Sequence, residues 1–129
     1  MGASAGRLTA DDYARNFSDL HPPLTRHEAF VEADRCLGCK KPRCVPGCPV
    51  GIDIPGFIQK ISQKDFRGAY DVITDTNLLP AVCGRVCPQE SQCEAQCVIG
   101  RNKKVEMQPV AIGRLERFRD FTGQHHERP

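Results

Sequence analysis

Eight cysteines, gathered in two groups, constrain this chain more than any other feature of its 129 residues. The first group has the spacing Cys-x2-Cys-x4-Cys-x3-Cys-Pro and begins at Cys36. The second places two Cys-x3-Cys pairs between Cys83 and Cys97. A chain of this length encloses a small core, and such domains often need disulfides or metals to stabilise them. The candidate explanations are therefore a disulfide framework, a zinc site or iron–sulfur clusters.

The rest of the sequence argues against disulfides. Residues 1–20 are polar and lack the apolar run of a secretory signal, and no stretch approaches the roughly 20 apolar residues of a membrane span. We therefore expect a cytoplasmic protein with no membrane contact, and cytosolic thiols are kept reduced. The net charge of +2 gives no indication of a nucleic-acid partner.

The spacing of the first group favours iron–sulfur clusters over zinc. In the bacterial ferredoxin run Cys-x2-Cys-x2-Cys-x3-Cys-Pro, the fourth cysteine binds a different cluster from the first three. By that logic Cys36, Cys39 and Cys44 share one cluster, whereas Cys48 binds a second. Zinc sites usually carry two Cys-x2-Cys pairs, and this chain has only one. Zinc is the alternative. Basic residues lie beside the cysteines and would offset the negative charge of thiolate-bound clusters; they are Lys40, Lys41, Arg43, Arg85 and Arg101.

The segments around the cysteines predict an all-α fold of short helices and loops. Residues 1–24 are predicted to form a loosely attached arm. A capping box of Thr25 and Glu28 predicts a helix that continues to Asp34. The next helix begins at 53 or 54, with Pro55 in its first turn, and another covers 65–75.

A last helix is predicted to begin at Pro109 and to end at Gly123. The sequence shows no convincing set of strands. Residues 122–129 are interpreted as a polar tail that would lead to flavin domains missing from this chain. The predicted buried faces of the helices comprise Phe57, Ile58, Ile61, Phe66, Ala69, Tyr70, Ile73, Ala111, Leu115 and Phe118.

Over roughly residues 25–121, the motifs resemble the amino-terminal region of glutamate synthase small (β) subunits. A related domain occurs in dihydropyrimidine dehydrogenase and in flavoprotein subunits of NADH-dependent ferredoxin:NADP oxidoreductases. The strings that carry the resemblance are Ala33-Asp34-Arg35-Cys36-x2-Cys39, Cys44-x3-Cys48-Pro49-Val50, Asp53-Ile54-Pro55-x-Phe57, Asn77-Leu78-Leu79-Pro80-x2-Cys83-Gly84-Arg85-Val86-Cys87-Pro88-Gln89-Glu90, Cys93-Glu94-x2-Cys97 and Ile112-Gly113-Arg114-Leu115-Glu116-Arg117-Phe118.

The resemblance implies an alpha-helical ferredoxin-like domain over residues 25–121 with two [4Fe–4S] clusters. The implied ligands of one cluster are Cys36, Cys39, Cys44 and Cys97. Those of the other are Cys48, Cys87, Cys93 and Glu116, which stands where the pyrimidine enzyme has Gln. Gly113 would let this cluster approach the helix backbone. Cys83 would be a buried thiol that binds no iron. A simple count of four plus four cysteines makes Cys83 the eighth ligand instead, and the residues leave both assignments open.

The resemblance also implies a role in electron transfer. In the family, this domain precedes domains that bind FAD and NADPH through glycine-rich fingerprints, and no G-x-G-x-x-G occurs in this chain. The expected function is to relay electrons from NADPH-reduced FAD to the flavin of a partner subunit, with no catalytic residue in this chain. The alternatives are the same domain from a pyrimidine-reducing or ferredoxin-coupled enzyme, or a structural module held together by metal.

Overall fold

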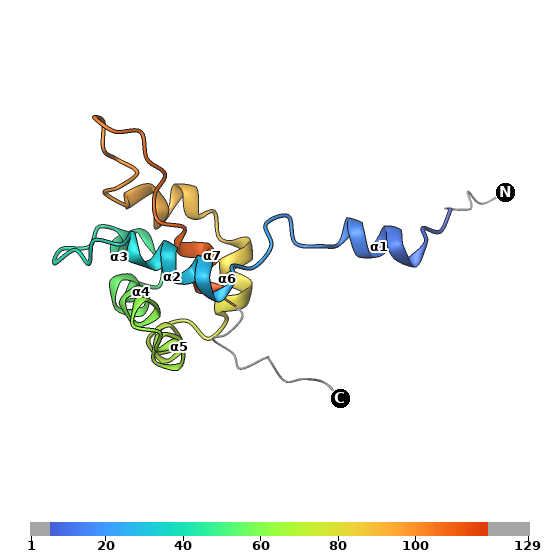
Figure 1. Ribbon diagram of the computed structural model, residues 1–129, viewed down its shortest axis with the longest axis horizontal. Helices are drawn as coiled ribbons and strands as arrows, with labels where there is room; N and C mark the ends of the chain where they lie inside the picture. Colours follow the sequence, from blue (N-terminus) through green and yellow to red (C-terminus); the bar gives the residue numbers. More distant parts are fainter. Residues whose placement is uncertain (1–5, 119–129) are drawn as a thin grey trace.

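The computed structural model describes residues 6–118 of the chain. Within this range it is helical and has no strand, as the sequence predicts. Figure 1 shows α2, α4, α5, α6 and α7 gathered in one body, from which an arm carrying α1 extends to one side. None of the described helices is long and apolar enough to cross a membrane. The helices are α1 (Ala10–Asn16), α2 (Arg26–Asp34), α3 (Cys44–Gly47), α4 (Ile54–Ser62), α5 (Phe66–Thr74), α6 (Pro80–Val86) and α7 (Ile112–Glu116), with 3-10 helices η1 (Gln89–Ser91) and η2 (Glu94–Gln96).

Side chains at three helix starts confirm the predicted boundaries. The Thr25 hydroxyl accepts from the N–H of Glu28, and the Glu28 carboxylate accepts from the N–H of Thr25, both at 3.2 Å. Asp53 caps α4 by accepting from the N–H of Gly56 at 3.1 Å, and Asp65 caps α5 in the same way. Such caps satisfy N–H groups that have no partner inside the helix. The sequence therefore fixes where α2, α4 and α5 begin.

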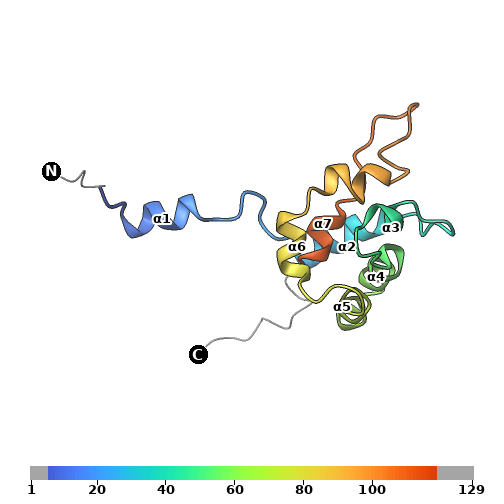
Figure 2. The same ribbon diagram turned by 180° about the vertical axis from the view of Figure 1, so that it is seen from behind.

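The hydrophobic core lies between α2, α4, α5 and α7, and Figure 2 shows these helices side by side from behind. Phe57 and Ile61 of α4 and Ile73 of α5 are fully buried. Each such side chain stabilises the fold by roughly 1.5–3 kcal/mol. The ring of Phe118 packs against that of Phe66, with 5.3 Å between centroids. The predicted apolar faces thus form the core, although Phe66 and Tyr70 are only partly buried, and Ala111 is half-buried and lies outside the core.

Helix α7 is shorter than predicted. It begins at Ile112 rather than at Pro109 and ends at Glu116; Gly123 lies outside the described residues. The N–H of Ala111 donates to the Glu32 carboxylate at 2.9 Å, and the N–H of Gly113 donates to the Glu94 carboxylate at 3.1 Å. Two carboxylates that are distant in the sequence therefore cap this helix. The residues around Pro109 alone cannot predict this start, because the capping groups belong to other segments.

Three other short helices are absent from the sequence prediction. The arm contains α1, which has a capping box of its own and buries no residue. Helix α3 lies inside the first cysteine group, and α6 overlaps the start of the second, where thiol spacing alone does not predict a helix. Helix α6 begins at Pro80, a residue suited to the first turn of a helix.

Helices α6 and α7 pack together through a glycine. A Cβ atom at Gly84 would lie 2.6 Å from the Cβ of Arg117 and 2.7 Å from the carbonyl oxygen of Gly113. These distances are too short for any side chain, and one of the two atoms belongs to the backbone. Only glycine allows this approach of the two helices.

We predict that Gly84→Ala destabilises the domain by about 1–3 kcal/mol, because the added methyl group pushes α6 and α7 apart. The thermal unfolding midpoint of the purified protein, measured at a fixed scan rate, should fall by several degrees. Gly6→Ala is the matched control, since a Cβ atom there meets nothing within 4 Å. Equal midpoints for the two variants would contradict the close packing described here.

Candidate metal centres

Four of the predicted ligands line a single pocket, called here the first site. They come from the end of α2, the loop that follows it, the start of α3 and the residue after η2. Apolar side chains from α4 and from the segment before α7 form much of the remaining wall. The four thiols are Cys36, Cys39, Cys44 and Cys97.

The thiols of the first site influence one another. Burial raises the pKa of Cys36, and the neighbouring Cys39 and Cys97 raise it further, whereas an N–H bond from Gly38 lowers it. Gly38 has a φ of 59°, in the left-handed region that suits glycine. Burial, followed by the charges of Cys36 and Cys97, raises the pKa of Cys44 to about 11. Ionising all four thiols is therefore unfavourable unless a cation balances their charge.

The second site gathers its donors from α3, α6, η2 and α7. Cys48 ends α3, Cys87 ends α6, Cys93 precedes η2 and Glu116 is the last residue of α7. Burial raises the pKa of Cys93 to about 12, and Glu116 and Cys48 are among the charges that raise it further. Burial also raises the pKa of Cys87, on which Cys83, Glu116 and Cys48 act. Cys87 and Cys93 are therefore each influenced by the charges of both Cys48 and Glu116, the other two predicted donors.

Glu116 is not an ordinary surface carboxylate. Its residue is 7% exposed, and burial raises its pKa to about 7 even though a hydrogen bond from Asn77 lowers it. The Asn77 amide nitrogen donates to Glu116 Oε1 at 2.8 Å. Asn77 Oδ1 accepts from the N–H of Leu79 at 2.9 Å and from the Cys83 thiol at 3.7 Å. Asn77 therefore links both candidates for the eighth ligand.

Two details differ from the sequence analysis. Cys83 is half-buried instead of buried, and it lies beside Cys87. The space above Gly113 is filled by the side chain of Gln89, where an added Cβ atom would meet the amide at 2.5 Å. Gln89 Nε2 in turn donates to the carbonyl of Cys83 at 3.2 Å. Because Gly113 has no side chain, Gln89 can pack directly against α7. Both Glu116 and Cys83 remain candidates for the eighth ligand.

Helices α3 and η2 join the two sites. Cys44 begins α3 and belongs to the first site, whereas Cys48 follows α3 and belongs to the second. Around η2 the order is reversed, with Cys93 before it and Cys97 after it. A Cβ atom at Gly47 would lie 2.8 Å from the carbonyl oxygen of Gln92, so the backbones of the two segments touch. Each short helix thus holds one donor of each site.

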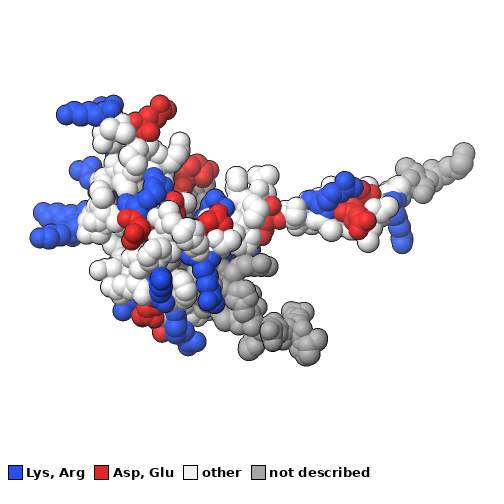
Figure 3. Space-filling view, in the orientation of Figure 1, with Lys and Arg blue, Asp and Glu red and all other residues white. Residues whose placement is uncertain are grey.

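Positive charge lies along one edge of the molecule, and Arg43 of this edge lines the first site. Figure 3 shows Lys and Arg side chains along the edge of the molecule where the loops 37–43 and 100–108 protrude in Figure 1. All the basic residues of these loops are exposed, and none forms an ion pair with a carboxylate of the described residues. Such charge would stabilise an anionic thiolate cluster.

The donor chemistry fits iron–sulfur clusters. All eight cysteines are free, four of them line the first site, and the carboxylate predicted for the second site is buried. Thiolates are the usual ligands of [4Fe–4S] clusters. Among residues 6–118, no three His, Cys, Asp or Glu side chains are arranged to bind a single metal ion. A helical fold that carries eight free cysteines in two groups fits a domain that binds clusters.

Comparison with known proteins confirms the resemblance. The chain belongs to the family of dihydropyrimidine dehydrogenase domain II, 4Fe–4S cluster, whose model matches residues 13–127. The glutamate synthase [NADPH] small chain of Escherichia coli is 37% identical over 102 residues, which cover 79% of this chain and 21% of that protein. The NAD-dependent dihydropyrimidine dehydrogenase subunit PreT of the same organism is 41% identical over 112 residues, 85% of this chain and 26% of the relative. The chain therefore spans only about a fifth to a quarter of these relatives.

We predict that Asn77→Asp weakens the second site, because it replaces the amide donor to Glu116 with a second carboxylate. The loss should be about 1–3 kcal/mol, the cost of a buried polar group without its partner. Thermal unfolding and the iron retained after a fixed exposure to chelator measure it. Asn102→Asp is the control, since exposed Asn102 uses only its Oδ1, which accepts from the N–H of Lys104 at 3.0 Å and is kept in the variant. Equal effects of the two substitutions would refute the role given to Asn77.

Proposed function

We propose that this domain holds two [4Fe–4S] clusters and relays electrons between an NADPH-reduced FAD domain and the flavin of a partner subunit, as in glutamate synthase. The family model supports the iron–sulfur assignment. The convergence of two four-donor sets on one scaffold supports two clusters rather than one. When bound, such clusters accept and release single electrons over a range of potentials that the protein tunes.

The ligands proposed for the first cluster are Cys36, Cys39, Cys44 and Cys97. Those proposed for the second are Cys48, Cys87, Cys93 and Glu116. The protein itself holds these donors in fixed positions, excludes water with the apolar wall of the first site and supplies positive charge at its rim. Because α3 and η2 each hold one donor of both sites, the sites lie at a fixed separation that a relay requires.

An apolar surface next to the second site is proposed to receive the flavin partner. Leu79, Val82 and Val86 recur at helical spacing on α6, and each is more than half exposed. Leu78 precedes them and is 80% exposed. Exposed apolar patches mark interaction sites, and this one borders Cys83 and Cys87. The matched residues make up only 21% and 26% of these relatives, so the partner can be a domain of the same polypeptide or a separate subunit.

A second candidate is the same relay in a pyrimidine-reducing enzyme. The relative PreT is 41% identical to this chain, slightly more than the glutamate synthase small chain of the same organism at 37%. The donor residues have the same task in either parent, and the cytoplasmic location stays a prediction in both. A structural zinc module is the alternative to both electron-transfer functions.

Iron and acid-labile sulfide per chain, measured on anaerobically purified protein, test the proposal. Two [4Fe–4S] clusters require about eight of each, with a brown colour that bleaches on dithionite. About four of each would reduce the proposal to one cluster. Zinc without sulfide, on colourless protein from iron-replete cells, would refute the relay and establish the structural module.

Substitutions at the two candidates for the eighth ligand should separate them. We predict that Glu116→Ala lowers iron from about eight to about four per chain, because the second cluster loses a donor, whereas Cys83→Ala keeps about eight. Glu116→Gln, which retains an oxygen donor without the charge, should keep more iron than Glu116→Ala. The reverse pattern, with iron lost only in Cys83→Ala, would assign the ligand to Cys83.

A further inference from the structure

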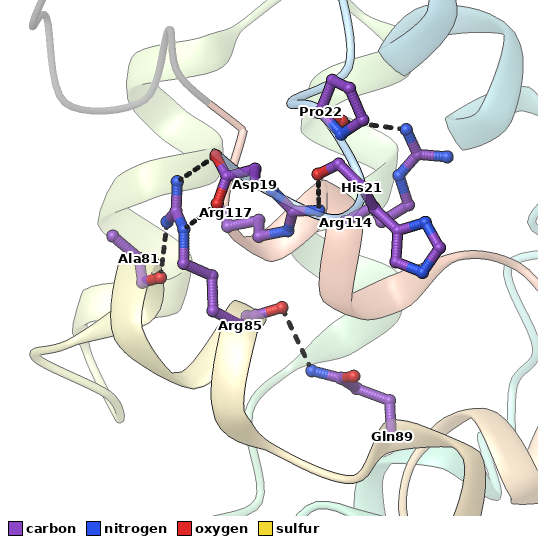
Figure 4. A network of polar contacts seen from close by, with 9 residues as sticks. Asp19, His21, Pro22, Ala81, Arg85, Gln89, Arg114 and Arg117 are labelled. Carbon is purple, nitrogen blue, oxygen red and sulfur yellow. Dashed lines mark hydrogen bonds and ion pairs between the residues drawn. The ribbon is translucent and has the colours of Figure 1, made fainter. Parts of the chain in front are cut away.

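A cavity of about 470 Å³ lies between the arm, α6 and α7, and no cysteine lines it. Its wall includes Arg85 of α6 and Arg114 and Arg117 of α7, and we call it the arginine pocket. Figure 4 shows the three guanidinium groups together beside residues 19–22 of the arm. Three cationic side chains from two helices around one cavity are costly unless something balances their charge.

Among the described residues, only Arg85 of the three arginines forms an ion pair with a carboxylate. Arg85 forms two bonds to the Asp19 carboxylate, at 3.1 and 3.4 Å. Arg114 Nη2 donates to the carbonyl of Pro22 at 2.9 Å, and Arg117 Nη2 donates to that of His21 at 2.6 Å. Those two acceptors are neutral backbone oxygens. They attach the arm to α7 but leave the positive charges of Arg114 and Arg117 in place.

Two guanidinium nitrogens of these arginines, Nε of Arg114 and Nη1 of Arg117, are buried and have no hydrogen-bond partner among the described residues. Arg117 as a residue is only 7% exposed. Buried polar atoms are almost always hydrogen-bonded, so each exception calls for a missing acceptor. Burial, together with Arg85 and Arg114, lowers the pKa of Arg117, which agrees with an excess of positive charge here.

The carboxylates around the pocket do not supply that acceptor. Asp19 is engaged by Arg85, although its charge also acts on Arg117. Glu94 accepts from the N–H of Gly113 at the start of α7. Glu90 is exposed at the rim. Among the described residues, these carboxylates therefore leave Arg114 and Arg117 without an ion pair.

We propose that the arginine pocket binds an oxyanion, a carboxylate or phosphate group, which accepts hydrogen bonds from Arg114 and Arg117. The two residues are three positions apart, so their side chains leave the same face of α7. Guanidinium groups suit carboxylate and phosphate oxygens, and bonds between such charged partners are stronger than neutral ones. The anion can be free in solution or carried by an acidic side chain of a neighbouring protein segment.

Binding at this pocket would hold the arm against α7. The same two arginines already bond to the carbonyls of His21 and Pro22, so an anion shared between them closes a network from the arm to α7. The site is independent of the proposed electron relay, because it uses none of the candidate cluster ligands.

Calorimetric titration of the purified, cluster-containing chain with inorganic phosphate and with acetate tests the proposal, with ionic strength kept constant by chloride. We expect phosphate, acetate or both to bind and to raise the thermal midpoint. Binding of phosphate alone assigns a phosphate ligand. Binding of acetate assigns a carboxylate, and an acetylated glutamate amide then represents an acidic side chain. Absence of binding by both anions overturns the proposal.

Two variants and a control test whether the anion binds at the arginine pocket. Arg114→Gln removes one donor group from a half-exposed position and should weaken the affinity by about tenfold or more, the value of one charge-assisted hydrogen bond. Arg117→Lys keeps the charge but loses the planar fork, and should weaken it as well. Arg67→Gln, on an exposed side chain of α5, changes the net charge equally and should leave the affinity within about twofold. Unchanged affinity in Arg114→Gln, or equal losses in Arg114→Gln and Arg67→Gln, would overturn the assignment.

Discussion

The contact between α3 and η2 is the constraint on which both cysteine sites depend. Each of these helices is flanked by thiols that belong to different sites, and their backbones meet at Gly47 and Gln92. Moving one helix would shift a donor of both sites at once. This coupling explains why the cysteine groups are interleaved in space, although they are far apart in the sequence. It also explains why glycine stands at the point of contact, since any side chain there would separate the two segments.

A shell of polar side chains then orients the donors. Asn77 contacts Glu116 and Cys83, and Gln89 occupies the space above Gly113 while it bonds to the carbonyl of Cys83. Such supporting residues fix ligand orientation and tune metal sites as strongly as many ligands do. Asn77 also stabilises the carboxylate of the second site, because the Glu116 side chain is buried and needs a hydrogen-bond donor there.

Local sequence signals predicted the parts of the fold that local chemistry decides. The capping residues Thr25 and Asp53 predicted two helix starts, and helical spacing predicted the buried faces of α4 and α5. Local signals gave the wrong start for α7, because that start depends on residues from other segments. The N–H groups of Ala111 and Gly113 donate to Glu32 and Glu94. The ligand sets came from a family resemblance, because spacing cannot show that Cys97 reaches Cys44. Nothing local could have identified Asn77 or Gln89, although both lie in the motif that carries the resemblance.

Helix α7 combines these constraints in five residues. Glu116 accepts a bond from Asn77, whereas Arg114 and Arg117, the residue after the helix, donate to the arm. So short a helix has little stability of its own, since nucleation consumes most of what its few hydrogen bonds provide. Its position must therefore come from its partners: Glu32, Glu94, the contact at Gly84 and the arm. The arm, although α1 buries no residue, therefore helps to hold α7 through the carbonyls of His21 and Pro22.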